Sequence, residues 1–561
     1  MTNASISDLF SLLSKLMDIH QENSFKAKSY ANAAFQIDKC AVALATIPHN
    51  QIAFQQGIGE SSAKKIIEIL ETGQMAQLNE LLAKTPEGIL ELMKIKGIGP
   101  KKIATIWHDL GVESPGELLY ACQENRLILY KGFGEKTQQS IQDALEFYFS
   151  NQDRYLFAEI EVSAALIEAR LSALLHQKVW ISGSMIRQEE IIEQLEFVVV
   201  GTSDEVQKLM AAADDFAFIQ VQEITHTILQ YRYQTTLNIS IHVCDSNSLA
   251  EVYFDTSATQ EFATAFKEQY KFSSQPLSAT LPDIGIFESL HLPYIPPYVR
   301  DQKEIIATIT STSFSEVIQE TDIQGVIHAH STWSDGKFSI EDMAKACREK
   351  GYTYLVMSDH SVSSFYARGL SVERIKEQQQ EIDALNNKMA PFRIFKSIEC
   401  DILNEGQLDY SDEVLQSFDV VIASVHQNLK MSEEKAMSRL MRAIENPYTR
   451  ILGHPTGRLL LSRKGYPIDH KAIIDACKLH DVVIEINANP RRLDLDWRWV
   501  RYAKEQGVMV SINPDAHQLS GIDDIRYGVL VAQKALLKKE QNLSSYSLAE
   551  FEQFISKRKA T

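Results

Sequence analysis

The sequence predicts a multidomain protein that combines α+β and α/β folds. From residue 325 on, seven short apolar segments alternate with amphipathic helices, which predicts a distorted parallel barrel of seven βα units. The first 150 residues read as helices joined by three similar glycine turns. Between these parts, residues 155–300 mix short strands with helices, as expected of a separate α+β region.

The bulk composition sets limits on function. A chain of 561 residues is long enough for three or more domains. The net charge of −18 argues against a protein coated in basic surface, although a local patch can still bind nucleic acid. Six well-separated cysteines without a CxxC pair favour a reducing cytoplasm and free thiols. Because we find neither a signal peptide nor a long apolar run, we expect a cytoplasmic protein without a membrane partner.

Three Gly-apolar-Gly turns mark the helical part: GIGESSAKKI (57–66), GIGPKKIATI (97–106) and GFGEKTQQSI (132–141). Such a turn lets backbone N–H groups approach an oxyanion at the start of the next helix. One turn of this kind needs no ligand, but three with lysines behind them predict a grip on a phosphate backbone. The candidate DNA-binding residues are Gly57, Gly59, Lys64, Gly97, Gly99, Lys101, Lys102, Gly132, Gly134 and Lys136.

The middle part contains the segment GSMIRQEEIIEQLEFVVVG at 183–201. A strand runs into a small turn and a second strand, LEFVVV, leaves it, which is the layout of a nucleotide-handling site. The positions where metal-binding aspartates are expected hold Gln194 and Glu196. A loop with LPYIPP closes this part at 292–297, since its prolines cannot continue a helix, and residues 301–320 resemble a linker.

The barrel segments end in histidines and acids. The C-terminal ends of the strands of a βα barrel open onto one face, so these side chains should converge. They are His328, His330, Asp335, His360, Glu399, His426, His454, Asp515 and His517. Imidazole with carboxylate suits Zn²⁺, Mn²⁺ or Fe²⁺, and nine ligands imply two or three divalent ions, with Glu399 as a bridge. Such clusters activate water and stabilise a phosphate under attack.

The segments HAHSTWSDG, SDH, SIECDIL, ASVH, GHPTGR and NPDAH resemble the ordered motifs of the polymerase-and-histidinol-phosphatase (PHP) family over about 325–535. The resemblance implies phosphoester hydrolysis at a trinuclear site, in which Glu399 and Asp515 are expected to be catalytic. By position it assigns His328, His330, Glu399 and Asp515 to one ion, Glu399, His426 and His454 to a second, and Asp335, His360 and His517 to a third. Arg458 and Arg491 become candidates to hold substrate phosphate, or else surface salt bridges.

The glycine turns resemble helix-hairpin-helix elements, which hold DNA without reading its bases. The stretch NSFKAKSYANAAF (23–35) resembles the opening of the lyase domain of family X DNA polymerases. In that family a lysine after the first hairpin forms a Schiff base with an abasic sugar, and Lys65 occupies its position. The alternative is a solvated helix lysine.

The order of the parts resembles bacterial family X DNA polymerases over nearly the whole chain. Gly183, Ser184 and Arg187 match the family's palm motif. Gln194 and Glu196 replace two of the palm aspartates, and Ser240 replaces the third. We therefore expect a degenerate palm that binds no Mg²⁺, because a single glutamate cannot hold two ions. In an alternative arrangement, Glu189, Glu190 or Glu193 recruits metal instead.

The resemblance predicts six segments. They are a lyase-like domain (1–80), a second helix-hairpin-helix domain (81–150), a degenerate palm (151–245), a thumb-like domain (246–300), a linker (301–324) and the PHP domain (325–561).

The combined evidence predicts a metal-dependent phosphodiesterase in DNA repair, a 3′-5′ exonuclease that acts on gapped, nicked or 3′-ended duplex. We expect a monomer that has lost polymerase activity. Two other functions remain open: an active family X polymerase with a PHP exonuclease, and a small-molecule phosphatase. A DNA-binding module whose metal site is only structural is a further alternative, which nine intact ligands oppose.

Overall fold

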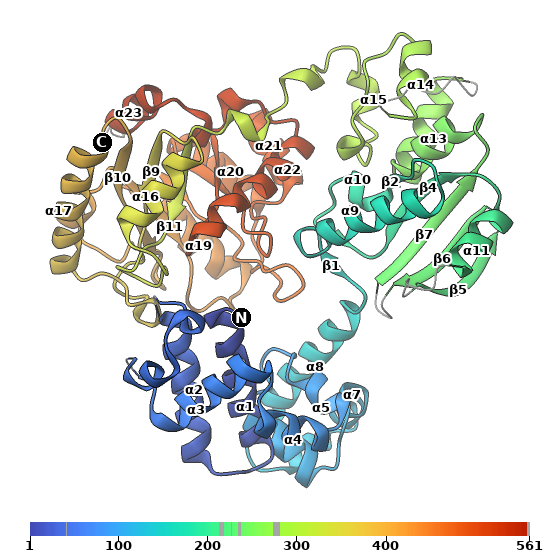
Figure 1. The fold of residues 1–561 in the computed structure, drawn as a ribbon. Coiled ribbons are helices and arrows are strands. Elements are labelled where there is room, and N and C mark those ends of the chain that lie inside the picture. Colours follow the sequence, from blue (N-terminus) through green and yellow to red (C-terminus); the bar gives the residue numbers. More distant parts are fainter. Residues whose placement is uncertain are drawn as a thin grey trace. The chain divides into compact units, whose positions relative to one another are not determined.

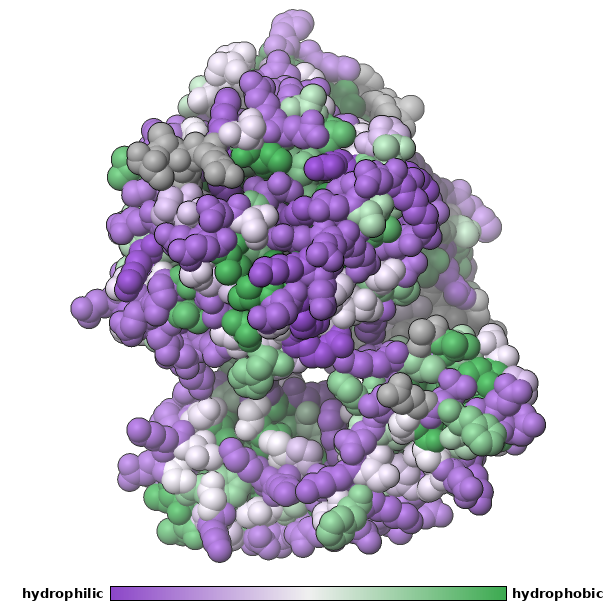
Figure 2. All heavy atoms as spheres, turned by 90° about the vertical axis from the view of Figure 1, so that its left-hand side faces the viewer, coloured by the Kyte–Doolittle hydropathy of each residue, from purple (hydrophilic) through white to green (hydrophobic). Residues whose placement is uncertain are grey.

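The fold is that of a computed structural model (Figure 1), which describes residues 1–40, 42–55, 57–212, 218–225, 227–233, 237–272 and 281–557. The chain forms two compact units, Met1–Gln152 and Asp153–Thr561. One face of the chain is shown in Figure 2, where hydrophilic residues predominate and hydrophobic ones are scattered between them. None of the helices in the described ranges has the length and apolar character that crossing a bilayer requires.

The first unit is helical. Its α-helices are α1 (Asn3–Ile19), α2 (Ser24–Lys39), α3 (Glu60–Thr72), α4 (Ala76–Lys84), α5 (Glu87–Leu92), α6 (Pro100–Ala104), α7 (Pro115–Gln123) and α8 (Glu135–Ser150). Helix α1 begins where the Thr2 side chain accepts a hydrogen bond from the Ser5 amide. Its apolar residues recur at helical spacing, and Ile6, Phe10 and Leu13 are fully buried in the core of the unit.

The second unit begins with a five-stranded sheet of strand order β2-β4-β7-β6-β5. The strands of this part are β1 (Tyr155–Leu156), β2 (Trp180–Ser182), β3 (Ile191–Ile192), β4 (Leu195–Val200), β5 (Phe218–Thr225), β6 (Ile228–Tyr233) and β7 (Leu237–Cys244). Helices α9 (Phe157–Leu174) and α11 (Ser203–Ala211) share one hydrophobic cluster with the sheet, and α12 (Leu249–Thr256) packs with another. The short helix α10 (Gly183–Ile186) joins β2 to the following turn.

A small helical layer follows the sheet. Helices α12, α13 (Gln260–Gln269), α14 (Ile284–Ser289) and α15 (Ile305–Thr308) enclose a core rich in phenylalanine. The fully buried Arg300 donates to Asp283 and to the Ser257 hydroxyl, which compensates the loss of its hydration. Ile305 and Ile309 pack into the same core, beyond residue 300, where the thumb-like domain was expected to end.

The remaining chain forms the predicted barrel, a seven-stranded parallel sheet with strands in sequential order. Its strands are β8 (Gly325–Ala329), β9 (Tyr354–Met357), β10 (Arg393–Asp401), β11 (Val420–Ser424), β12 (Ile451–Leu452), β13 (Val483–Asn487) and β14 (Val510–Asn513). Its α-helices are α16 (Ile340–Glu349), α17 (Val372–Met389), α18 (Asp412–Leu415), α19 (Glu433–Glu445), α20 (His470–Leu479), α21 (Trp497–Gln506), α22 (Ile525–Lys534) and α23 (Leu548–Ser556). A single parallel bridge between Ala329 and Ala516 nearly closes the sheet.

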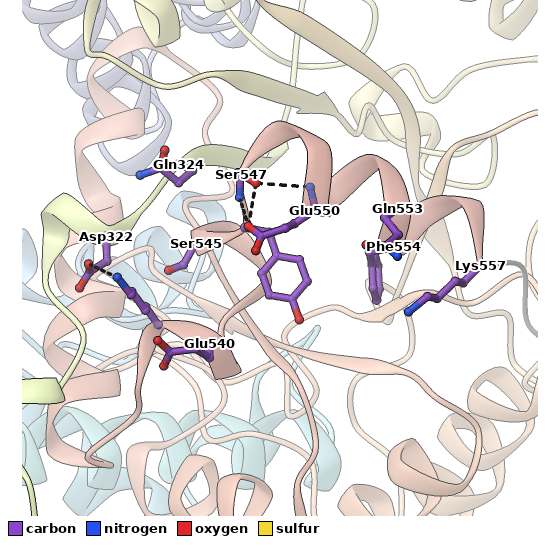
Figure 3. A pocket seen from close by; sticks show the side chains of 11 residues that line it. Asp322, Gln324, Glu540, Ser545, Ser547, Glu550, Gln553, Phe554 and Lys557 are labelled. Carbon is purple, nitrogen blue, oxygen red and sulfur yellow. Dashed lines mark hydrogen bonds and ion pairs between the residues drawn. The ribbon is translucent and has the colours of Figure 1, made fainter.

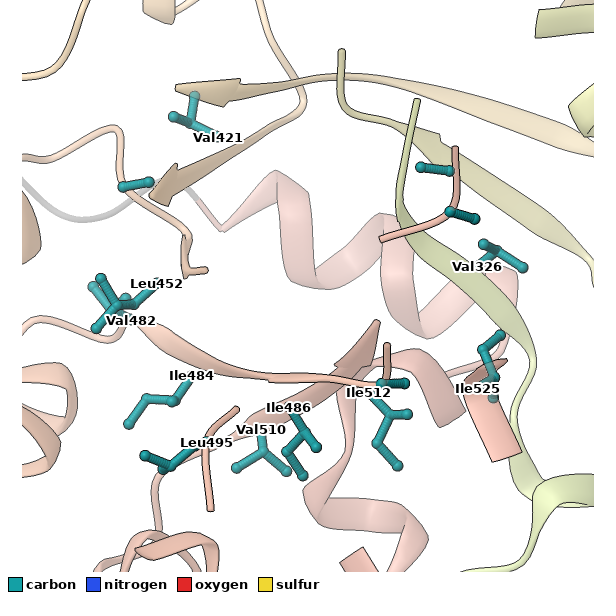
Figure 4. Packing of buried hydrophobic residues seen from close by; sticks show 14 of the residues in the cluster. Val326, Val421, Leu452, Val482, Ile484, Ile486, Leu495, Val510, Ile512 and Ile525 are labelled. Carbon is teal, nitrogen blue, oxygen red and sulfur yellow. The ribbon is translucent and has the colours of Figure 1, made fainter. Parts of the chain in front are cut away.

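The barrel strands are almost entirely buried, as expected of parallel strands covered on both sides, and only Arg393 and Lys396 of β10 are not. Figure 4 shows strand residues Val326, Ile484 and Ile512 packed beside Leu495 and Ile525 from the outer layer. A second cluster joins strand residues to C-terminal Leu543 and Phe551. These two layers of packing confirm the predicted α/β barrel.

A polar pocket lies at the N-terminal end of the barrel strands (Figure 3). It is lined by Gln324, which immediately precedes β8, and by residues of the C-terminal segment such as Glu550 and Phe554. Its lysines and acids face one another, as Lys539 and Asp322 do at 4.0 Å. This pocket is therefore separate from the strand ends that carry the histidines.

Candidate metal centre, glycine turns and palm

All nine predicted side chains converge at the C-terminal ends of the barrel strands. The backbone bulges at His328, where the register between β8 and β9 shifts. Positive φ values at His328 (67°) and Asp515 (52°) are unusual for residues with a side chain. Unusual backbone angles of this kind are common at functional sites, where the surrounding structure holds a side chain in one direction. Here they occur at two of the side chains that converge.

Glu399 lies at the centre of the cluster. One carboxylate oxygen is 2.9 Å from His454 Nε2 and 3.0 Å from His426 Nε2. The other oxygen is 3.0 Å from His360 Nδ1, while His328 Nε2 lies 3.4 Å from the first oxygen. His330 Nε2 also lies 3.6 Å from the second oxygen, so the carboxylate is in contact with five imidazoles. This is the position that the predicted bridging role requires.

Two further groups flank this centre. His330 Nε2 is 3.1 Å from Asp515 Oδ1, and His328 Nε2 is 3.5 Å from the same oxygen. Asp335 Oδ1 lies 3.6 Å from His360 Nε2 and 3.4 Å from His517 Nε2. The compact groups able to hold an ion are His328 with His330 and Asp515, His360 with Glu399 and His426, and His330 with Asp335, His360 and His517. His330 and His360 thus each stand between two groups, a sharing that the sequence assignment did not include.

The donor set fits divalent cations. Buried nitrogen atoms His328 Nε2, His330 Nδ1 and His360 Nδ1, and the oxygen Glu399 Oε2, have no hydrogen-bond partner. A buried polar atom without a partner costs free energy, and an ion would satisfy these atoms. Burial raises the pKa of Glu399, but His426, His328 and His360 outweigh it and bring that pKa well below its usual range. The carboxylate is therefore ionised, as a ligand must be.

A second layer of acids orients the imidazoles. His328 Nδ1 lies 2.6 Å from Glu485 of β13, and His426 Nδ1 lies 2.7 Å from Asp401 of β10. Carboxylates of this kind fix the tautomer and ring direction of a metal-binding histidine. The sequence reasoning missed both residues. Asp401 stands two residues after Glu399 in the SIECDIL motif, which was an available signal. Glu485 lies in the middle of β13, far in sequence from the candidate ligands, and only the fold brings it to His328.

Arg458 does not point to a free phosphate position. Its guanidinium donates to Glu190 at 2.6 Å and to Asp496 at 2.8 Å. The exposed Arg491 pairs with Glu159 at 3.2 Å. A different arginine approaches the cluster, since Arg492 Nε is 3.6 Å from Asp515 Oδ2. The substrate role expected of Arg458 thus has to compete with a buried ion pair, and Arg492 is the better placed cation.

The three glycine turns share one backbone conformation. The first glycine of each has a positive φ: 76° at Gly57, 96° at Gly97 and 95° at Gly132. The second glycine of each is the N-cap of a helix, α3, α6 or α8, without a side-chain hydrogen bond to the cap. The apolar residue between them is buried in each turn. The amides at these helix starts have no side-chain cap and can meet an anion.

The lysines behind the turns differ in exposure. Lys64, Lys101 and Lys136 are exposed, as residues that contact a phosphate backbone would be. Lys65 is half-buried, with its ammonium 5.7 Å from the ring centroid of the buried Tyr30. Lys65 is therefore less exposed to solvent than the neighbouring Lys64.

The described part of the palm contains no group of three or more possible metal ligands. Glu196 on β4 pairs with Ser240 on β7 in the sheet register, and its carboxylate is 3.0 Å from His242. A Cβ on Gly183 would lie 2.3 Å from Glu196 Oε1, so the glutamate covers the glycine turn. Gln194 lies at the approach to β4. The Glu196 carboxylate therefore lies between the glycine turn and His242.

The other acids near the turn already have cationic partners. Glu189 lies 3.4 Å from Lys534, Glu190 pairs with Arg458, and Glu193 lies 3.0 Å from Arg154. Among the described residues, every group of three or more possible metal ligands lies in the barrel. A rearranged metal site built from these three glutamates finds no support in this geometry.

Family models match three segments of the chain. A helix-hairpin-helix domain matches residues 1–75, a SAM-like helix-hairpin-helix tandem matches 89–146, and a PHP domain matches 327–513. Helical hairpins joined to a PHP barrel define a protein that combines DNA-binding modules with a metal-dependent hydrolase fold. Over the barrel alone, the chain is 31% identical to a probable phosphatase of Caldanaerobacter subterraneus subsp. tengcongensis, with 34% of this chain and 74% of that protein covered.

The whole chain has a full-length relative. This chain is 33% identical to the DNA polymerase/3′-5′ exonuclease PolX of Bacillus subtilis (strain 168), and the match covers 98% of both chains. The chain belongs to the PolX family of bacterial family X DNA polymerases with a C-terminal PHP domain. The predicted family, the helix-hairpin-helix elements and the PHP domain are thereby confirmed.

Proposed function

We propose that this protein is a 3′-5′ exonuclease that processes DNA 3′ ends in its barrel and has no polymerase activity. The observation that carries the proposal is the convergence of nine imidazole and carboxylate side chains with Glu399 at their centre, while the described part of the palm offers no comparable group of possible metal ligands. The relative from Bacillus subtilis bears the name of both activities, and the described geometry of this chain favours one of them. Gapped, nicked or 3′-ended duplex is the proposed substrate.

Two or three divalent ions, Zn²⁺, Mn²⁺ or Fe²⁺, are the proposed cofactors. When bound, they supply a nucleophile from water and neutralise charge on the attacked phosphate. Glu399, Asp515 and the seven other side chains would hold them. Glu485 keeps His328 oriented, and Asp401 keeps His426 oriented. Arg492, in the loop after β13, supplies a cation for the substrate phosphate.

The proposed division of labour follows the domain boundaries expected from the sequence. Residues 1–80 and 81–150 hold DNA through their glycine turns, with Lys65 as a possible Schiff-base lysine for abasic sugars. Residues 151–245 and 246–300 serve as a scaffold, 301–324 as a linker and 325–561 as the hydrolase. We further propose that the protein works as a cytoplasmic monomer without a membrane partner.

One assay separates the candidate activities. The purified protein with Mn²⁺ is given a labelled gapped duplex, with and without deoxynucleotides. Shortening of the 3′ strand under both conditions supports the exonuclease. Extension with deoxynucleotides supports an active polymerase, an activity that the name of the Bacillus relative includes. Hydrolysis of small phosphomonoesters alone supports the phosphatase reading, which the barrel's likeness to probable phosphatases favours.

A further inference from the structure

The loop between β9 and α17 carries two exposed aromatic side chains. Phe365 is 79% exposed and Tyr366 is 58% exposed. Within the described part of 153–557, these are the only aromatic residues in the exposed class. Exposed aromatic residues also occur in the first unit, for example Phe25 and Phe54, so exposure by itself does not indicate a ligand. The case for binding rests on the position of this pair beside the candidate metal centre.

The aromatic pair begins beside the candidate metal centre. The Tyr366 ring centroid lies 6.4 Å from that of His360, one of the histidines in contact with Glu399. The Phe365 ring centroid lies 6.1 Å from that of Tyr366, with the rings steeply inclined. The two rings therefore lead outward from the cluster along the C-terminal end of the barrel.

The loop is fastened to the same residues that orient the centre. Ser364 Oγ donates to Asp401 at 2.6 Å, and Asp401 also holds His426 at 2.7 Å. The Leu370 amide donates to the His360 carbonyl at 2.9 Å, and Arg368 donates to the Thr332 carbonyl at 3.2 Å. Because the backbone is held at both ends, the rings are presented with little ordering left for a ligand to impose.

We propose that Phe365 and Tyr366 form a stacking platform for the bases of the last nucleotides at a DNA 3′ end. The inference rests on the proposed exonuclease function and adds the way in which the terminal nucleotides are held. Every base offers a π-face, so stacking on aromatic residues is tolerant of sequence and suits an enzyme that removes any nucleotide. The pair would hold the bases while the adjoining phosphate lies in the metal centre.

A protein partner fits this feature less well. Two aromatic side chains offer about 150–250 Å² each, whereas a stable interface buries about 800 Å² on each partner. A strand of unpaired bases needs only the ring faces and a route to the metal centre, and the loop provides both.

The test compares substrates and variants in one matrix. DNA with an unpaired 3′ end is prepared with its bases intact and with the last two bases replaced by abasic residues. The proteins are wild type, Phe365→Ala/Tyr366→Ala, Tyr366→Phe, and Leu479→Ala as a matched loss of exposed apolar surface (80% exposed) on α20. Stacking of a base on an aromatic side chain strengthens binding by a factor of about 5 to 150 for each base.

We expect the double variant to raise KM for the intact end at least fivefold, with kcat for methyl p-nitrophenyl phosphate unchanged. For wild type, the abasic end should raise KM by the same factor as the double substitution does on the intact end. For the double variant, the abasic end should not raise KM any further. Tyr366→Phe and Leu479→Ala should behave as wild type. The proposal would be overturned if the double variant had an unchanged KM for the intact end. It would also be overturned if the abasic end raised the KM of the double variant by the same factor as it raises that of wild type.

A binding measurement keeps this inference distinct from the exonuclease proposal. 2-Aminopurine placed as the last base should lose fluorescence on rapid mixing with wild type, before hydrolysis, and should keep it with the double variant. If wild type never shortens DNA, the proposed function fails while this readout still decides the stacking. Equal quenching by both proteins would rule out the platform even if DNA is shortened.

Discussion

Arg458 of the barrel donates a hydrogen bond to Glu190, which follows the glycine turn of the palm, at 2.6 Å, although 268 residues separate them. The side chains are only 16% and 13% exposed. Arg458 lies in the loop after β12, four residues beyond His454, and also holds Asp496. The pair therefore fastens the loop that presents a candidate ligand to the palm, where Gln194 and Ser240 stand at two positions expected to hold aspartate.

Replacement of Glu190 by Ala should lower both stability and hydrolysis. Arg458 would keep Asp496 but lose one partner for a largely buried charge, which should cost about 3 kcal/mol of unfolding free energy. We also expect a roughly tenfold lower rate on a small phosphodiester, of the size that a displaced active-site loop produces. Denaturant titration and hydrolysis rates measure the two effects.

Glu159→Ala is the matched control for this change. It removes a pair with Arg491 whose side chains are 62% and 42% exposed, and an exposed pair contributes less than about 1 kcal/mol. It also removes the hydrogen bond that Glu159 accepts from the Leu156 amide at the start of α9, so Glu159→Gln, whose amide oxygen can still accept this bond, is measured beside it. If Glu190→Ala behaves like these controls, the palm does not support the barrel loop.

Hydrolysis should depend on the barrel carboxylates. Glu399→Ala removes the central contact of five histidines, and Asp515→Ala removes the partner of His328 and His330. We expect a loss of about a hundredfold or more, together with a lower bound metal content measured by elemental analysis. His480→Ala, outside the cluster, is the control. Near-wild-type rates in both carboxylate variants would place the nuclease elsewhere.

Primer extension should be absent in Mg²⁺ and in Mn²⁺. Glu196 is paired with His242 and covers Gly183, and Gln194 and Ser240 supply no carboxylate. Two Mg²⁺ ions therefore lack the oxygen ligands that nucleotidyl transfer requires. Gel analysis of a gapped primer tests this, with aspartate introduced together at positions 194, 196 and 240 as the comparison. Templated extension by the unmodified protein would contradict it.

Lys65 is expected to form a Schiff base with an incised abasic site. Its side chain is half-buried beside the ring of Tyr30, which distinguishes it from the exposed Lys64. Attack on the sugar aldehyde requires the free amine of this lysine. Borohydride trapping should give a covalent adduct that Lys65→Ala abolishes. Lys64→Ala, which changes an exposed neighbour, should keep it. Equal trapping by wild type and Lys65→Ala would end the assignment.

Removal of residues 1–152 should separate DNA binding from chemistry. The remaining unit, Asp153–Thr561, is compact by itself and retains the pair between Glu190 and Arg458. A small phosphodiester should be hydrolysed at the full-length rate, whereas KM on duplex DNA should rise, since lost uniform binding affects KM before kcat.

The salt dependence of DNA binding supplies the second readout for this deletion. Fewer phosphate contacts release fewer counterions, so the slope of affinity against salt should become shallower. An unchanged slope and KM would mean that the glycine turns are structural, and the small-molecule phosphatase would become the leading function.

Local pattern determined much of this protein. Apolar strands followed by amphipathic helices predicted the seven-stranded barrel, and the candidate ligands were predicted to converge because strand ends in such a barrel meet on one face. The glycine turns were equally visible, because a positive φ at Gly57, Gly97 and Gly132 follows from short-range backbone geometry.

Only the tertiary structure decided which groups meet over long sequence distances. It paired Arg458 with Glu190 rather than leaving it free for phosphate, placed Glu485 behind His328, and set Glu196 against His242. It also showed Phe365 and Tyr366 exposed beside His360. Spacing along a strand or helix fixes the direction in which a side chain points. The partner that neutralises a charged side chain, however, lies on another element. Tertiary packing decides which element that is.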